Sequence, residues 1–276
     1  MKDKYSAIWV SHSSMSDYLK CPRAYYLRNV YRDPKTNKKI SVIEPPLALG
    51  QAVHETIEGL SKLPVDERFA VPLLDRLEKS WLQITGQKGG FISNDQEEKY
   101  KARAVAMIKR VDEHRGLLTA KAIKIRQDLP YYWLSEEDNI ILCGKIDWLE
   151  YNEVTDAVRI VDFKTGKSDE DPESLQLPIY YLLATHTQTK PITGIAYWYL
   201  DRDDEPIDLP FPDADESYKR VLDIAKKVAL ARKLGHFKCK EDGCRACRPY
   251  EMVLSGLATK VGQNSFGQDL YILRLK

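Results

Sequence analysis

Alternating apolar and polar residues flank a polar segment near the middle of the chain. Leu142–Leu149 and Val158–Lys164 have the period of two that is typical of strands, and Asn152–Asp156 between them has the composition of a turn. The pattern therefore predicts a β-hairpin. Its symmetric register places Asp147 directly opposite Asp162 on one face of the hairpin.

Two opposed carboxylates need a neutralising partner. Directly opposed residues hold their Cβ atoms roughly 4.5–5.5 Å apart, and like charges at that distance destabilise the pair. A divalent cation bound by Asp147 and Asp162 would remove the repulsion, and oxygen ligands suit Mg²⁺ or Mn²⁺. Lys164, on the same face, would place an ammonium group beside that cation. The alternative is an exposed hairpin whose acidic side chains are solvated.

Other periodicities predict the elements around this hairpin. Apolar residues at helical spacing predict helices over 15–31 (capped by Ser13 or Ser14 and divided at Pro22), from Leu47 onward, over 72–84 and 95–118, from the cap at Ser174 onward, and over 215–234. Strands are expected over 122–133 and 192–200, a loop over 33–46, and a short strand at 270–276. Helices before and after a small mixed sheet predict an α/β core with a helical insertion.

The composition is that of a folded, water-soluble domain. The chain has 276 residues, of which 43% are hydrophobic and 30% charged. No apolar run is long enough to span a bilayer, and the N-terminus lacks a signal-peptide core, so we expect a cytoplasmic protein without membrane contact.

The net charge is +1, which argues against a large non-specific nucleic-acid footprint. Basic residues nevertheless gather in 1–40, 98–126 and 218–240, whereas acidic residues gather in the loop at 201–206. This separation fits a groove that follows phosphates. Solvated helix faces would explain it equally well.

Five cysteines in a reducing compartment favour metal ligation over disulfides. Cys239-x₄-Cys244-x₂-Cys247 supplies three closely spaced thiols near the C-terminus, and a fourth must come from elsewhere. Cys143, beside Gly144, is expected to be a small core thiol rather than a ligand.

Several short motifs occur in an order that is similar to one known family. They are Cys21-Pro22, Gly50-x-x-x-His54, Gly144-x-x-Asp147, Val161-Asp162-Phe163-Lys164 and Gln176-x-x-x-Tyr180. Together they resemble the RecB-like branch of the PD-(D/E)XK nucleases, over about 11–247. The resemblance implies a single nuclease domain over 1–276, with N-terminal helices (11–60), a helical insertion (61–120), a catalytic core (121–235) and a cysteine cluster with a tail (236–276).

The resemblance also implies an active site in a restriction-endonuclease-like core. His54, Asp147, Asp162 and the carbonyl of Phe163 would hold one or two Mn²⁺ or Mg²⁺ ions, and the imidazole would favour Mn²⁺. Lys164 would assist by orienting the nucleophile or offsetting charge. The side chains implied to position the DNA strand and the active site are Gln176 and Tyr180.

For the cysteines, the resemblance implies a [4Fe–4S] cluster held by Cys21, Cys239, Cys244 and Cys247, which joins the N- and C-terminal segments. The spacing departs from the family, whose C-terminal triplet is usually C-x₂-C-x₅-C, because Val253 stands where the last cysteine is expected. A four-cysteine zinc site is therefore the alternative.

The function expected from these features is a metal-dependent DNA nuclease, an exonuclease acting on single-stranded or end-bearing DNA. Recombination, repair, phage DNA processing and CRISPR adaptation are the settings that the resemblance implies, with a protein partner in a DNA-processing complex. The main alternative is a non-catalytic DNA-end-binding subunit of a larger complex. A zinc-stapled interaction protein is a third hypothesis.

Overall fold

The computed structural model describes residues 3–125 and 127–273, which form two compact units. The first contains the chain up to Glu44, Trp133–Leu142 and the chain from Lys219 onward. The second contains Pro45–Tyr132 and Cys143–Tyr218. Among the described residues, no helix is long and apolar enough to cross a membrane.

Helices and short strands alternate in the first unit. Its helices are α1 (His12–Lys20), α2 (Pro22–Tyr25), most of α7 (Ala214–Leu234) and α8 (Arg248–Leu254), and a π-helical turn covers Tyr26–Val30. Its strands are β1 (Ile8–Val10), β2 (Ile40–Val42), β3 (Tyr131–Ser135), β4 (Ile140–Cys143), β9 (Ala258–Gln263) and β10 (Asp269–Leu273). They form two three-stranded sheets, ordered β1-β4-β3 and β2-β10-β9.

Both ends of the chain contribute to the first unit. Strands β2 and β10 pair in parallel, with Ile40 opposite Asp269. Helix α1 begins at a capping box in which Ser11 accepts the backbone N–H of Ser14 while the hydroxyl of Ser14 accepts that of Ser11. The predicted cap at Ser13 or Ser14 is therefore wrong by a few residues, whereas the predicted break at Pro22 is confirmed.

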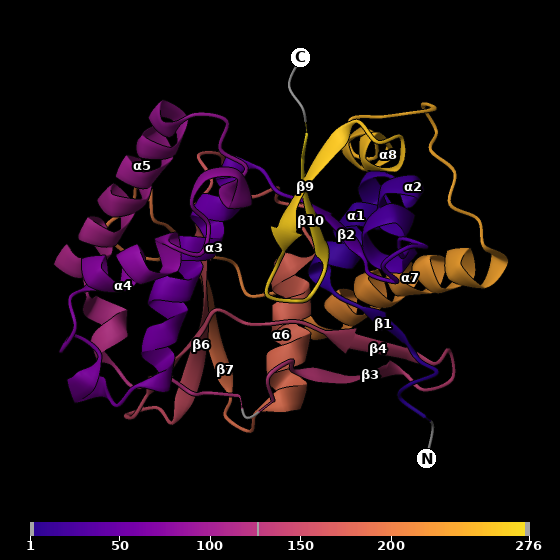
Figure 1. Cartoon of the computed structure of the whole chain (residues 1–276). Coiled ribbons are helices and arrows are strands. Elements are labelled where there is room, and N and C mark those ends of the chain that lie inside the picture. The colour runs from indigo at the N-terminus through magenta and orange to yellow at the C-terminus, as the bar shows by residue number, and fades with distance from the viewer. Residues whose placement is uncertain (1–2, 126, 274–276) are drawn as a thin grey trace. The chain divides into compact units, whose positions relative to one another are not determined.

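The second unit combines a mixed sheet with a group of helices. Its helices are α3 (Pro45–Glu58), α4 (Leu73–Trp81), α5 (Asn94–Glu113) and α6 (Gln176–Thr187). Its four-stranded sheet is ordered β5 (Trp148–Asn152), β6 (Ala157–Lys164), β7 (Ile192–Tyr199) and β8 (Ile207–Asp208). Helices α3, α4 and α5 pack side by side (Figure 1), and α6 packs on β7.

The predicted hairpin forms in the predicted register. Trp148 pairs with Val161 and Asn152 with Ala157. The side chain of Asn152 accepts the N–H groups of Val154 and Thr155, and Asp156 takes a positive φ of 52°, so the turn residues fix the register.

The first predicted strand of the hairpin is nevertheless wrong as a continuous element. Leu142 and Cys143 end β4, which pairs with β1, and strand structure resumes only at Trp148. Asp147 therefore precedes the ladder and is not part of it. Long-range pairing with β1 takes the early residues into another sheet, which no local pattern reveals.

Two other predicted elements also differ. Ala122–Trp133 is not one strand: Ala122 makes an isolated bridge to Glu150, and β3 starts at Tyr131, after a polar stretch ending in Pro130. The predicted loop over 33–46 contains β2. The predicted tail strand is present as β10 up to Leu273, and its last residues lie outside the described part of the chain.

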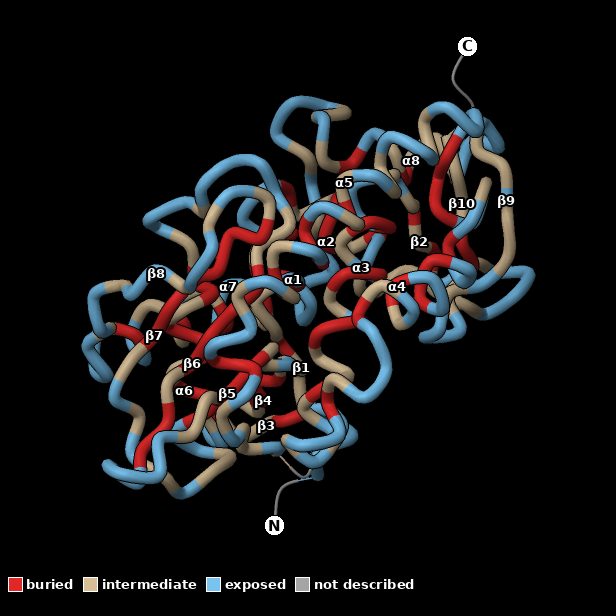
Figure 2. The backbone as a smooth tube through the Cα atoms, turned by 90° about the vertical axis from the view of Figure 1, so that its left-hand side faces the viewer, coloured by how far each residue is buried: buried red, intermediate tan, exposed pale blue. Residues whose placement is uncertain are grey.

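Strand β6 is central, with β5 antiparallel on one side and β7 parallel on the other. Its burial pattern includes buried residues on both faces of the strand, and Figure 2 shows most of its length as buried. Phe163 contacts the rings of Trp148 and Trp198 in the core. Any polar side chain on β6 is consequently held in a fixed, mostly dry position.

Basic residues on α5 are neutralised within this unit. Arg103 pairs with Asp201 at 3.2 Å, and Arg110 pairs with Asp204 at 2.6 Å. The acidic loop at 201–206 therefore compensates the basic helix locally. This pairing weakens the expectation of a phosphate-binding groove along this helix, because part of its positive charge is already paired.

One buried arginine braces the residues next to the hairpin. Arg68 is 2% exposed, donates to the carbonyls of Leu60, Leu118 and Ala120, and lies over the ring of Trp148 at 5.1 Å. These contacts fix the loops on either side of α4 and α5 against the core.

We expect Arg68→Ala to lower the free energy of unfolding by about 2–4 kcal/mol, because it leaves buried carbonyls unsatisfied. Urea denaturation would measure the change. The matched control is Lys79→Ala, at an exposed position of α4, for which we expect a change within about 0.5 kcal/mol. Equal midpoints for the two variants would show that Arg68 does not brace the fold.

Candidate active site

A single pocket in the second unit brings together the predicted catalytic residues. It opens where α3, the carboxyl end of β6 and the start of α6 meet. The residues lining it are His54, Asp147, Asp162, Phe163, Lys164, Thr165, Gly166, Ser168, Glu170, Gln176 and Tyr180. Four motifs that are far apart in the sequence thus contribute to one site.

Helix α3 presents His54 to the pocket from the edge of its buried face. Gly50, one turn earlier, passes close to the loop after β6, and a Cβ there would lie 3.2 Å from Oγ1 of Thr165. The glycine of Gly50-x-x-x-His54 therefore allows α3 to approach the catalytic loop closely. The imidazole also packs edge-on against Phe163, with ring centroids 6.4 Å apart.

Two carboxylates approach the same nitrogen of His54. Nδ1 lies 2.9 Å from Oε1 of Glu58 and 3.4 Å from Oδ2 of Asp147. Burial alone would lower the pKa of His54, but the hydrogen bond with Glu58 and the charge of Asp147 outweigh it and raise the pKa to about 9. In the absence of a cation, the imidazole is therefore protonated at neutral pH.

Asp147 is held by the strand that it precedes. Its Oδ2 accepts the backbone N–H of Phe163 at 3.0 Å, and its side chain is only 9% exposed. Burial raises its pKa well above the usual value, and the charges of Asp162 and Glu58 raise it further. A nearby positive charge is needed to stabilise the ionised form.

Asp162 lies on β6 and is 2% exposed. Its Oδ1 accepts the Nε2 amide of Gln176 at 3.0 Å. Its Oδ2 lies 3.0 Å from Nζ of Lys164, yet it makes no well-aligned hydrogen bond within the described residues. One buried carboxylate oxygen of this pocket-lining residue therefore lacks an aligned hydrogen-bond donor among the described residues.

Lys164 contacts several acceptors. Its Nζ lies 3.0 Å from Asp162, donates to Glu170 at 2.9 Å and donates to the side-chain oxygen of Gln176. Burial would lower its pKa, but the charges of Asp162 and Glu170 outweigh burial and raise it. The ammonium group therefore remains charged. Of its three partners, only Glu170, which is partly exposed, lies on a loop.

Gln176 and Tyr180 lie on one face of α6, as their spacing predicts. Gln176 connects Lys164 to Asp162, and its Nε2 also lies 3.1 Å from the hydroxyl of Tyr180. Both side chains are 8% exposed. The structure places them as supports of the acidic and basic side chains, and their contact with DNA stays a prediction.

Sequence reasoning missed two acidic residues at this site: Glu170 lines the pocket, and Glu58 contacts His54. Glu58 is one turn after His54 on α3, and this i,i+4 spacing was a usable signal. Glu170 lies in the acidic loop after β6, where several carboxylates follow one another and no local pattern distinguishes it.

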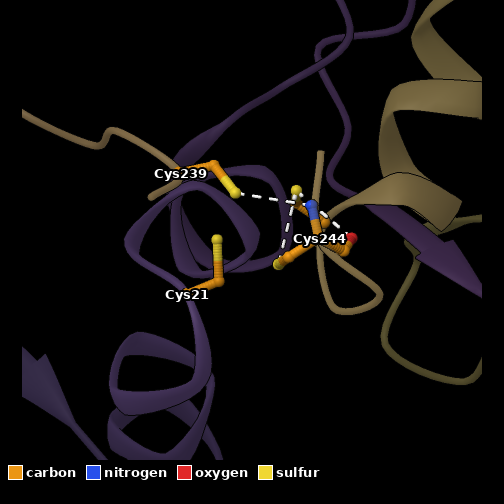
Figure 3. Close-up of side chains that lie close together, drawn as sticks. Cys21, Cys239 and Cys244 are labelled. Atoms are coloured by element: carbon orange, nitrogen blue, oxygen red, sulfur yellow. Dashed lines mark hydrogen bonds between the residues drawn. The ribbon is translucent and has the colours of Figure 1, made fainter. Parts of the chain in front are cut away.

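The four cysteines predicted to act together are gathered in the first unit. Cys21, at the start of α2, meets Cys239, Cys244 and Cys247, with all four Sγ atoms within 4.8 Å of one another. Figure 3 shows the thiols of Cys21, Cys239 and Cys244 converging. Hydrogen bonds from the N–H groups of Gly243 and Cys244, the first of several such contacts, lower the pKa of Cys239 to about 6. These four residues form a group of closely spaced thiols, which joins the N- and C-terminal segments of the chain.

Cys143 is not part of this group of four cysteines and has a different environment. It is buried at the end of β4, and burial raises its pKa to about 11, which keeps it protonated. The expectation that it is a core thiol agrees with this environment.

The chain has similarities to known proteins. A crystal structure from Eubacterium rectale, described as a "Putative exonuclease", is similar over 87% of this chain and 87% of its own, with 15% identity and a TM-score of 0.47. No sequence among the curated proteins matches. The family model of the PD-(D/E)XK nuclease superfamily matches residues 9–252, which is most of the chain. The chain therefore belongs to the PD-(D/E)XK nuclease superfamily.

Proposed function

We propose that this protein is a divalent-metal-dependent deoxyribonuclease of the RecB-like type. The observation that carries the proposal is the convergence of His54, Asp147, Asp162 and Lys164 in one pocket. Family membership supports nuclease activity, and the pocket supplies acidic, imidazole and ammonium groups in the places where such a reaction needs them.

The donor set fits a hard divalent cation. Ligands around an octahedral ion with bonds of about 2.0–2.1 Å stand about 3 Å apart. Nδ1 of His54 is 2.9 Å from Glu58 and 3.4 Å from Asp147, which is close to this spacing. We propose that Glu58 joins His54, Asp147, Asp162 and the carbonyl of Phe163 as a holder of Mn²⁺ or Mg²⁺.

A cation held there would supply Lewis-acid stabilisation of the charge that develops on the scissile phosphate. The protein's own groups have complementary tasks. Lys164 places a positive charge in the lining of the pocket, where it would offset phosphate charge. Gln176 holds Lys164 and Asp162 at a fixed separation, because it bonds both. The N–H of Phe163 fixes Asp147.

The substrate that we propose is single-stranded or end-bearing DNA, cut by exonuclease action. The order and spacing of the motifs support this, since they resemble the RecB-like branch. Recombination, repair, phage DNA processing or CRISPR adaptation are compatible settings, with a DNA-processing partner protein. A cytoplasmic location is supported by five cysteines without a disulfide among the described residues.

The rival function is a non-catalytic DNA-end-binding subunit. Such a module needs the fold but has no need for a buried, charged and mutually bonded set such as Asp162, Lys164 and Gln176, which is expensive to maintain in a core. DNA affinity without cleavage, in Mn²⁺ and in Mg²⁺, would favour the rival.

We expect Asp162→Asn to reduce cleavage of end-labelled single-stranded DNA by about a thousandfold, because it removes a charged cation holder without changing side-chain size. The matched control is Asp208→Asn, at an exposed position of β8 in the same sheet, for which we expect parental activity. Parental cleavage by the Asp162 variant would contradict the assignment. Circular dichroism would confirm that both variants fold.

We expect Glu58→Gln to weaken Mn²⁺ binding at least about tenfold by isothermal titration calorimetry, because a charged oxygen close to His54 is lost. Glu55→Gln is the control, since Glu55 is on the same helix but exposed. If both variants bind Mn²⁺ as the parent does, Glu58 is not part of the cation site.

In EDTA, the protein is expected to lose stability as pH rises from about 6.5 to about 9. The folded state raises the pKa of His54, so folding favours the protonated imidazole. This contribution is fully present below the unfolded value of 6.5 and disappears as pH passes the folded value of about 9. Urea midpoints for the parent and His54→Gln test this. The parent should show the steeper decline, and parallel curves would refute the assignment.

A further inference from the structure

We propose that Cys21, Cys239, Cys244 and Cys247 bind one tetrahedral Zn²⁺ ion, in place of the iron–sulfur cluster that the resemblance implies. The Sγ atoms of Cys244 and Cys247 are 3.7 Å apart, and all four Sγ atoms lie within 4.8 Å of one another. This inference concerns the first unit and does not depend on the proposed nuclease activity.

The separation of the thiols decides between the two groups. Four thiolates around a single ion, with Zn–S bonds of about 2.3 Å, stand about 3.8 Å apart at the corners of a tetrahedron. In a [4Fe–4S] cluster each thiolate binds a different iron, and the iron–sulfide cube lies between them. The thiolates must then stand much further apart than 4.8 Å. The observed group is the size of one ion.

The backbone around Cys239 has the form of a tight metal-binding turn. Asp242 and Gly243 both have positive φ angles, of 51° and 122°. This conformation turns the N–H groups of Gly243 and Cys244 toward Sγ of Cys239, at 3.5 and 3.4 Å. Two N–H donors on one thiolate stabilise its charge, and they hold Cys239 close to Cys244.

The environment of residue 253 explains the unusual spacing. Val253 packs against an apolar cluster that contains Leu27, Ile40 and Tyr250. A cysteine at position 253 would therefore lie in that apolar cluster and not among the other thiols. Cys239, which precedes the turn, supplies the remaining thiolate. The C-terminal triplet therefore consists of Cys239, Cys244 and Cys247, in a compact arrangement.

Two of the four cysteines, Cys21 and Cys247, are buried, whereas Cys239 and Cys244 are partly exposed. Cys21, Ala24 and Cys247 are each at most 3% exposed and form one buried cluster, against which Ala246 packs. Four protein ligands around one ion make a closed site, which is typical of structural zinc. Zinc would thus link the start of α2 to the segment before α8, and the two helices themselves are joined by the ion pair between Arg23 and Glu251.

Elemental analysis tests the proposal directly. The full-length protein is produced with both iron and zinc in the growth medium, purified without oxygen, and measured by inductively coupled plasma mass spectrometry and visible absorption. We expect one zinc per chain, no stoichiometric iron and no iron–sulfur absorption. Four irons per chain, one iron per chain, or freely titratable thiols without zinc would each overturn the proposal.

Two further measurements keep the test independent of folding defects. Replacement of zinc by Co²⁺ should give the visible bands of tetrahedral thiolate coordination, and their absence would contradict the geometry. Cys244→Ser should lose most of the zinc and melt at a lower temperature, whereas the control Cys143→Ala should retain one zinc per chain. Full zinc content in the Cys244 variant would show that the ion lies elsewhere.

Discussion

The crowding of carboxylates beside β6 is the constraint on which the second unit depends. Asp147, Asp162 and Glu58 gather within a small, partly buried volume, and burial together with mutual repulsion raises the pKa of Asp147. Such an arrangement is stable only when positive charge or hydrogen-bond donors accompany it. His54, Lys164 and Gln176 provide these partners from α3, β6 and α6. The same arrangement supports the proposed cation site, because the fold concentrates more negative charge there than its own cationic side chains neutralise.

The position of β6 makes this concentration possible. A central strand buried on both faces would normally be apolar throughout, and all but a few side chains of β6 follow that rule. Asp162 is the polar side chain of β6 that is fully buried, and its Oδ1 is satisfied by Gln176, which is also buried. The buried amide of Gln176 therefore compensates the cost of burying the carboxylate of Asp162, and the hydrogen bond holds both side chains rigidly. Rigidity of this kind is what positions catalytic groups without a reorganisation cost.

Local chemistry determined which parts of the fold could be read from the sequence. The hairpin register was predictable because Asn152 and Asp156 encode the turn, and the break at Pro22 because proline lacks an N–H. The division of Leu142–Leu149 between two sheets was not predictable, since it depends on pairing of β4 with β1, more than a hundred residues away in sequence. Short strands such as β2 carry too few residues for a period to be visible.

The candidate site was more predictable than the topology, because its residues had to occur in a fixed order. His54, Asp147, Asp162, Lys164, Gln176 and Tyr180 line or support one pocket. Glu58 is one helical turn from His54 but matches no motif. Glu170 has no such spacing and matches no motif either. The structure is therefore needed to assign both residues to the site.

The pocket in the second unit and the cysteine group differ in the chemistry of the ligand atoms that they offer, and this difference separates the tasks that we propose for them. The pocket in the second unit offers carboxylate oxygens and one imidazole, with His54 and Glu58 each more than a quarter exposed, so a hard cation could enter and exchange. The cysteine group offers only thiolates, two of them almost fully buried, and leaves no ligand position for a substrate. Soft ligands in a closed shell suit a permanent structural ion, because each bond also links two segments of the chain. The chemistry of the two groups therefore keeps their proposed tasks apart, because a hard cation that exchanges in the carboxylate pocket would have little affinity for the four thiolates.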